Sequence, residues 1–102
     1  MLKQLFHASP ASNTQSILKK GVLRGMDGCV YLAETPEDAL KFMAFRLNVD
    51  AVAVFRIDAT KLELACLNES TDHSEEFFKC KAYYYDMDIP KEFIRDATQY
   101  RR

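Results

Sequence analysis

The sequence predicts an α+β fold in which two helices pack on split, mostly antiparallel β-sheets. Strand-like and helix-like segments alternate in the first half of the chain, whereas strand-like segments follow one another in the second half. The length of 102 residues is close to the commonest domain size and allows one ordinary core. We therefore expect a single domain over residues 1–102.

The first expected elements are a strand over residues 2–7 and a helix over residues 11–20. Ser9 and Pro10 have the pattern of a helix start, with Ser9 as the N-cap and Pro10 at the first helical position. Two lysines followed by Gly21 have the pattern of a helix end.

The middle of the chain repeats this pattern. A turn-rich loop over residues 24–28 precedes an expected strand over residues 29–34. Thr35, followed by a proline and two acidic residues, predicts the N-cap of a second helix that runs to about residue 47. Residues 51–57 are apolar on both faces, which predicts a central strand.

The second half is expected to contain strands over residues 62–67 and 77–87, separated by a polar loop over residues 68–74. The tail, residues 95–102, is polar, and we expect short structure there followed by fraying. A turn before the tail returns two apolar side chains to the core, those of Phe93 and Ile94.

Charge and composition argue against several classes of function. The net charge is −1 with acids and bases interspersed, whereas a duplex nucleic acid partner calls for a basic face. No apolar run approaches the roughly 20 residues needed to span a bilayer, and the N-terminus lacks a signal-peptide pattern. Three cysteines without zinc-site spacing predict buried thiols in a reducing cytoplasm: Cys29, Cys66 and Cys80.

Two strand-like segments each offer one polar or aromatic side chain to a candidate pocket. His7 ends the first segment and Tyr31 lies within the second. Residues that bind ligands are often found at the ends of elements, which favours a ligand role for His7. In the structural interpretation, which the residues alone favour for His7, its ring is hydrogen-bonded to backbone in the core, and Tyr31 is an ordinary strand residue. The residues alone leave both interpretations open.

Segments that follow one another over nearly the whole chain resemble the ADP-ribosyltransferase-like fold. They are residues 5–9, 17–23, 30–33, 36–39 and 88–94. Mono-ADP-ribosyltransferases, poly-ADP-ribose polymerases and RNA 2′-phosphotransferases share this split-sheet fold. The resemblance implies that the domain binds NAD, as substrate or ligand, or a related ADP-ribose compound.

The resemblance also implies roles for individual residues. By position, His7 would hydrogen-bond the ribose next to the nicotinamide, and Tyr31 would stack on the nicotinamide ring. Ser9 and backbone groups near Ala8 would hold the carboxamide, and Arg24 would face the diphosphate. Three glycines would let the neighbouring loop approach the phosphates: Gly21, Gly25 and Gly28.

One position departs from the family pattern. Members that transfer ADP-ribose usually carry a glutamate about eight residues before the proline of the closing turn, where it stabilises the transition state. Counting back from Pro90, that position holds Ala82. An active enzyme would need Glu75 or Glu76 in its place.

Three functions therefore stay open. The first is a domain that binds NAD or an ADP-ribose compound, with or without transfer of ADP-ribose to a macromolecule. The second is a catalytically degenerate protein-interaction module of the inhibitor or immunity type. The third is an RNA 2′-phosphotransferase-like activity, which needs basic residues to hold an RNA phosphate beside NAD. Three arginines are available for it: Arg24, Arg46 and Arg56.

Overall fold

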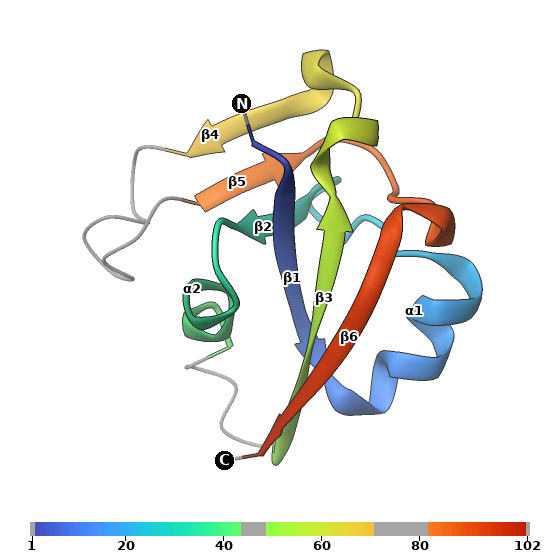
Figure 1. Ribbon diagram of the computed structural model, residues 1–102, viewed down its shortest axis with the longest axis vertical. Coiled ribbons are helices and arrows are strands. Elements are labelled where there is room, and N and C mark those ends of the chain that lie inside the picture. The colour runs from blue at the N-terminus through green and yellow to red at the C-terminus, as the bar shows by residue number, and fades with distance from the viewer. Residues whose placement is uncertain (1, 44–48, 71–81, 102) are drawn as a thin grey trace.

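The computed structural model describes residues 2–43, 49–70 and 82–101. Its strands are β1 (Gln4–Pro10), β2 (Val30–Ala33), β3 (Ala51–Asp58), β4 (Leu67–Ser70), β5 (Ala82–Tyr85) and β6 (Ile94–Arg101). Its helices are α1 (Thr14–Lys20), α2 (Pro36–Lys41) and the short 3-10 turns η1 (Ala11–Asn13), η2 (Ala59–Lys61), η3 (Leu64–Cys66) and η4 (Lys91–Phe93). The strands form one six-stranded antiparallel sheet in the order β4-β5-β2-β1-β3-β6, which confirms the α+β class (Figure 1).

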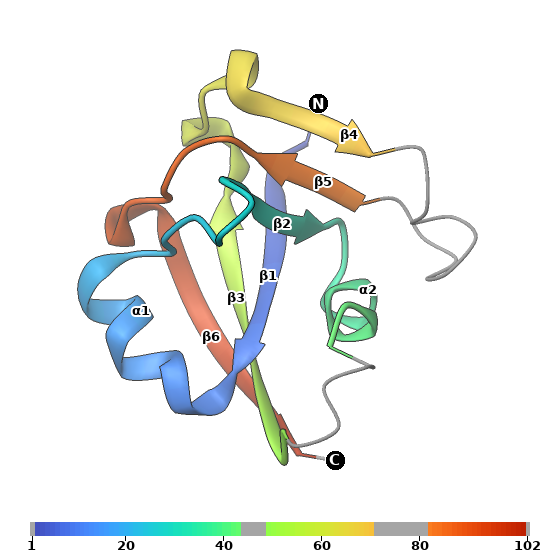
Figure 2. The same ribbon diagram turned by 180° about the vertical axis from the view of Figure 1, so that it is seen from behind.

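The sheet divides between β1 and β2. Within the described residues these two strands pair only through Phe6 and Ala33, whereas β1 pairs with β3 along its whole length. Figures 1 and 2 show β2, β5 and β4 running across the direction of β1, β3 and β6. The prediction of split sheets is therefore corrected: the described strands form one continuous sheet, whose two halves meet at a single residue pair.

Two apolar clusters lie on opposite faces of the strands, because successive side chains of a strand alternate. The α1-side cluster includes Ile17 of α1, and its fully buried members include Leu5, Leu32, Phe55, Ile57 and Ile89. The α2-side cluster consists of Phe6, Ala33, Ala39, Met43, Val52 and Val54.

The second helix begins as the sequence predicts. The Oγ1 of Thr35 accepts a hydrogen bond of 3.1 Å from the backbone N–H of Asp38, and Pro36 occupies the first turn. Gly21 ends α1 as expected, with φ of 87° and its N–H donating to the Ile17 carbonyl at 2.7 Å. The expected end of the second helix near residue 47 lies outside the described residues.

The predicted N-cap role of Ser9 is wrong. β1 continues through Ser9 to Pro10, so Ser9 is a strand residue paired with Ala53. Its buried Oγ accepts a hydrogen bond of 3.1 Å from Nδ2 of Asn13 instead of capping a helix. The α-helix starts only at Thr14, after the η1 turn.

The last third of the chain differs from expectation in two places. Residues 62–66 are not a strand, because they contain η3. β4 begins at Leu67, the last residue of the expected strand, and continues to Ser70 through what was expected to be a polar loop. The tail forms β6, an eight-residue strand paired with β3, which makes β3 an interior strand as predicted. As expected, Phe93 and Ile94 pack against the α1-side cluster.

Of the strand expected over residues 77–87, the described part is β5, and residues 77–81 lie outside the described residues. Within the parts of the chain that the structure describes, no helix is long and apolar enough to cross a membrane.

Candidate functional site

His7 lies where β1 and β2 diverge. Its Nδ1 is 2.9 Å from the backbone carbonyl oxygen of Tyr31, on the edge of β2 that faces β1. A carbonyl oxygen can only accept, so Nδ1 carries the proton and the Nε2 of the neutral ring holds a lone pair. Burial lowers the pKa of His7 below 6.5, although the hydrogen bond to Tyr31 partly opposes this shift. The imidazole is therefore neutral at pH 7, with Nε2 as an acceptor.

The phenol of Tyr31 has a different partner. Its hydroxyl donates a hydrogen bond of 2.5 Å to Oδ2 of Asp27, and this bond is the main reason why the pKa of Tyr31 is raised to about 12. The side chain is 47% exposed and lies beside Tyr84, its partner in β5. The ring of Tyr31 is thus held at the surface by the loop that precedes β2.

The two rings leave the sheet on opposite faces. His7 shares a face with Leu5 and pairs with Phe55, and both of these belong to the α1-side cluster. Tyr31 shares a face with Ala33, which belongs to the α2-side cluster. The expectation that the imidazole and the phenol line one cleft is therefore corrected: the backbone of Tyr31, not its ring, meets His7.

Of the two residues expected to hold a carboxamide, Ser9 lies on the face of His7 and Ala8 lies on the opposite face. Ser9 follows His7 by two residues in β1 and is buried beneath Asn13. Ala8 packs against the α2-side cluster. Asn13 was missed in the sequence because the predicted helix placed it in a first turn, away from the strand. Its polar side chain four residues after Ser9 was the available signal.

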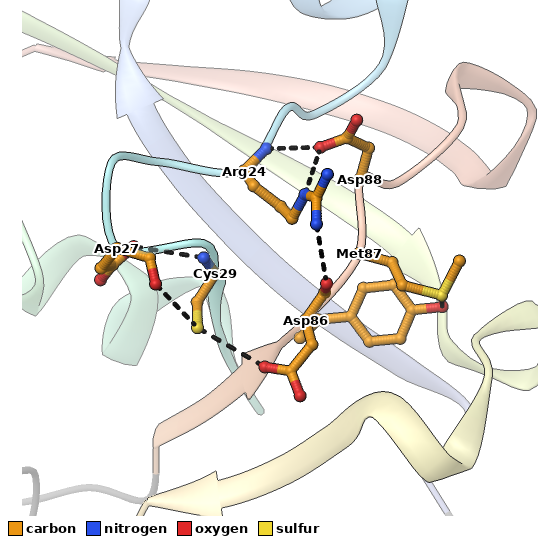
Figure 3. A network of polar contacts seen from close by, with 7 residues as sticks. Arg24, Asp27, Cys29, Asp86, Met87 and Asp88 are labelled. Atoms are coloured by element: carbon orange, nitrogen blue, oxygen red, sulfur yellow. Dashed lines mark hydrogen bonds and ion pairs between the residues drawn. The ribbon is translucent and has the colours of Figure 1, made fainter.

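Arg24 lies in the loop before β2 and is hydrogen-bonded to Asp86 and Asp88 (Figure 3). Its backbone N–H and its Nε donate to Oδ1 of Asp88, at 2.7 and 3.3 Å, and its guanidinium also reaches the carbonyl of Asp86 at 3.4 Å. The Sγ of Cys29 contacts the carboxylate of Asp86 at 3.6 Å. Arg24 is half-exposed, but Asp88 already compensates its charge, which weakens its expected role facing a diphosphate.

The position expected for a catalytic glutamate is apolar and buried. Ala82 is 6% exposed and pairs with Ala33 in β2 and with Ser70 in β4. Glu75 and Glu76 lie outside the described residues.

The structure shows a hydrogen-bonded carboxylate that was not expected from the sequence. Glu34, directly after β2, accepts a hydrogen bond of 2.6 Å from the hydroxyl of Tyr83. Burial and this carboxylate together raise the pKa of Tyr83. An acidic residue at the end of a strand opposite a tyrosine-rich segment was the signal that could have found this pair.

Other chemistry finds little support among the described residues. They hold no group of three His, Cys, Asp or Glu side chains that could bind a metal ion. Cys29 and Cys66 are free thiols, and burial together with nearby carboxylates raises the pKa of Cys29, so this thiol is protonated at neutral pH. Arg24 and Arg56 do not converge, because Arg56 lies in β3 and pairs with Asp96 of β6.

A search against protein-family models found no match to this chain, and a comparison with curated proteins also found none.

Proposed function

We propose that this chain is a cytoplasmic, ADP-ribosyltransferase-like domain that binds NAD or a related ADP-ribose compound where β1 and β2 diverge. The observation that carries the proposal is the neutral His7, whose Nδ1 is committed to the Tyr31 carbonyl while Nε2 remains an acceptor. The free thiols Cys29 and Cys66 support a reducing compartment.

The proposed contacts follow from hydrogen-bonding capacity. A ribose hydroxyl of the ligand would donate to Nε2 of His7. A carboxamide has both donors and an acceptor. The N–H and C=O of one strand residue point to the same edge, so Tyr31 would offer its N–H there, and its carbonyl oxygen has a second lone pair beside the bond to His7. Ser9 and Asn13, on the same side as His7, add a hydroxyl and an amide. In this proposal Tyr31 contributes its backbone only, and Arg24, which is paired with Asp88, is not among the direct contacts.

Binding, rather than transfer of ADP-ribose, is the activity that we propose. Ala82 supplies no charge to the transition state, and loss of one such preorganised group commonly lowers a rate roughly a hundred- to a thousandfold. Transfer at a normal rate would require Glu75 or Glu76 to enter the site.

Titration with NAD and with ADP-ribose, followed by amide chemical shifts, tests the proposal. We expect shifts at residues 7–9 and 30–32 in the unaltered protein. His7→Ala should weaken binding about tenfold or more, because the ligand loses a hydrogen bond to the neutral imidazole and is no longer oriented by it. Tyr31→Phe is the matched control and should bind like the parent, since it keeps the backbone contact. Absence of any shift with either ligand would overturn the proposal.

One observation favours the second candidate, a catalytically degenerate protein-interaction module. Tyr31 and Tyr84 lie side by side on the face opposite His7, and Tyr31 is nearly half-exposed. Tyrosine is enriched in protein interfaces. A protein that ignores NAD and ADP-ribose but loses a protein partner when Tyr84 becomes alanine would be such a module, of the inhibitor or immunity type.

A further inference from the structure

A polar hollow of about 430 Å³ lies where β1 begins and β3 ends, and it is separate from the site around His7. Six residues line it: Lys3, Gln4, Arg56, Asp58, Thr60 and Arg95. Gln4 pairs with Asp58 and Phe6 pairs with Arg56, so the strand residues of the hollow share the face of Phe6, whereas His7 points to the opposite face. The hollow and the proposed NAD site therefore cannot be one continuous pocket.

The lining carries an excess of positive charge and many hydrogen-bond donors. Three cations and one carboxylate border the hollow, and Asp96 lies beside it. Two of the three cations, Arg56 and Arg95, are in ion pairs, so the excess positive charge is that of Lys3. That carboxylate, Asp58, is paired with Arg95 and also accepts from the backbone N–H and the hydroxyl of Thr60, at 3.1 and 2.5 Å. These partners hold the pKa of Asp58 down to about 2, so it stays ionised and fixed in place.

The second arginine is held in a similar way. Nε and a terminal nitrogen of Arg56 donate to Oδ2 of Asp96, at 3.0 and 2.7 Å, and the other terminal nitrogen reaches Oε1 of Gln4 at 3.3 Å. Because Oε1 of Gln4 accepts this bond, its amide nitrogen is left with two donors. Both guanidinium groups are thus preorganised by neighbouring side chains.

The remaining capacity of the lining is almost entirely that of donors. A guanidinium has five N–H groups, and Arg95 gives one of its nitrogens to Asp58. Lys3 adds an ammonium on an exposed side chain. A ligand that matches this lining carries negative charge and several acceptor oxygens.

We propose that this hollow binds the phosphate group of a small phosphate monoester. Phosphate supplies only acceptors and carries close to two negative charges at neutral pH, which suits the ammonium of Lys3, the remaining N–H groups of two ion-paired arginines and a donor amide. The hollow, of about 430 Å³, is open to solvent on one side and exceeds what a bare phosphate fills. The site therefore has room for the organic part of the molecule as well.

Amide chemical shifts of the full chain test the proposal with three probes: inorganic phosphate, ribose 5-phosphate and ribose. We expect both phosphates to shift the resonances of Arg56, Thr60 and Arg95, with ribose 5-phosphate binding the tighter of the two. Ribose alone should shift none of them. Shifts with ribose, or no shift with either phosphate, would overturn the proposal.

Variants that remove one positive charge distinguish specific binding in the hollow from non-specific electrostatic attraction to the protein surface. Lys3→Gln and Arg95→Gln should each weaken ribose 5-phosphate binding about tenfold, the loss expected for one charge-assisted contact. Lys20→Gln removes the same charge at the end of α1, outside the hollow, and should change nothing. Lys3 precedes β1 and its side chain is exposed, so Lys3→Gln tests the site even if Arg95→Gln destabilises the fold.

Equal weakening by Lys20→Gln would mean that only unspecific charge attraction is at work, and the proposed site would not exist. The result of the ribose 5-phosphate titration is independent of that of the NAD titration, because NAD is expected to shift the resonances of residues 7–9 and 30–32 instead.

Discussion

At the scale of single residues, His7 satisfies a backbone group that the divergence of β1 from β2 leaves without a strand partner. The Tyr31 carbonyl points to an edge that β1 covers at one residue pair only, and the imidazole Nδ1 takes the place of a strand N–H. The structural interpretation of His7 and a ligand role are compatible, because the two ring nitrogens are distinct. One nitrogen supports the fold and the other faces a ligand in our proposal.

A pH-dependent stability follows from the lowered pKa of His7. The unfolded chain binds the proton near the ordinary value of 6.5, whereas the folded protein binds it only at lower pH. The contribution of the neutral ring is therefore complete above pH 6.5 and is lost as the pH falls through and below that value. Urea unfolding at a series of pH values should show this loss.

His7→Asn provides the control for that series. An asparagine amide can still donate to the Tyr31 carbonyl but does not titrate, and His73 is common to both proteins. The parent should lose stability relative to His7→Asn as the pH is lowered. A constant difference between the two proteins across the series would show that the folded-state pKa of His7 is not lowered.

At the scale of elements, the connection after α1 depends on close backbone packing. Gly21 has φ of 87°, and a Cβ at this position would lie 2.2 Å from the carbonyl oxygen of Ile89. Val22 then pairs with Ile89 through two backbone hydrogen bonds of 2.8 Å. This bridge joins the end of α1 to the segment that leads into β6.

Two glycine variants separate steric contact from backbone strain. Gly28 also has a positive φ, of 82°, but nothing lies within 4 Å of its added Cβ. Gly28→Ala should therefore cost only the strain of a positive φ, about 1 kcal/mol, in the free energy of unfolding. Gly21→Ala should cost clearly more, because the backbone of residue 89 must also move. Equal losses in urea unfolding would contradict the close approach at Gly21.

The local sequence predicted some element boundaries correctly and others wrongly, because long-range strand pairing can outweigh local preferences. Thr35-Pro36 and Ser9-Pro10 are similar patterns, yet only Thr35 caps a helix. Ser9 is held in a strand by its pairing with β3, and this long-range ladder outweighs the local preference. β6 was missed because an edge strand with exposed side chains on both faces shows no alternation of polar and apolar residues.

The candidate site was predictable only in part. The sequence singled out His7 and the segment around Tyr31, and the structure brings the His7 ring to the Tyr31 backbone. The sequence could not reveal that the side chains of His7 and Tyr31 lie on opposite faces of the sheet. That relation depends on the pairing of Phe6 with Ala33, which the fold as a whole fixes.

At the scale of the whole molecule, the two halves of the sheet share the α1-side cluster, which contains residues from β1, β2, β3 and β5. Phe55 of β3 is among its largest fully buried side chains. The position of His7 against the edge of β2 therefore depends on the packing that holds the halves together.

Removal of the Phe55 side chain should destabilise both halves of the sheet together. Phe55→Ala should lower the free energy of unfolding by about 3–5 kcal/mol, the usual range for a buried phenylalanine. Val54 is the neighbour of Phe55 in β3 but belongs to the α2-side cluster. Val54→Ala should lower the free energy of unfolding by less, because fewer buried atoms are lost. Urea unfolding followed at amides of both halves should give one transition. Separate transitions for β1-β3-β6 and β2-β5-β4 would show that the shared cluster does not couple them.

The nitrogen spectrum of the His7 ring tests the central claim most directly. In the free protein at pH 7.5 we expect a neutral ring protonated on Nδ1, and on saturation with NAD we expect the Nε2 resonance to shift as it accepts a hydroxyl hydrogen bond. A ring that carries its proton on Nε2, or an Nε2 resonance that stays unchanged while NAD binds, would contradict the account.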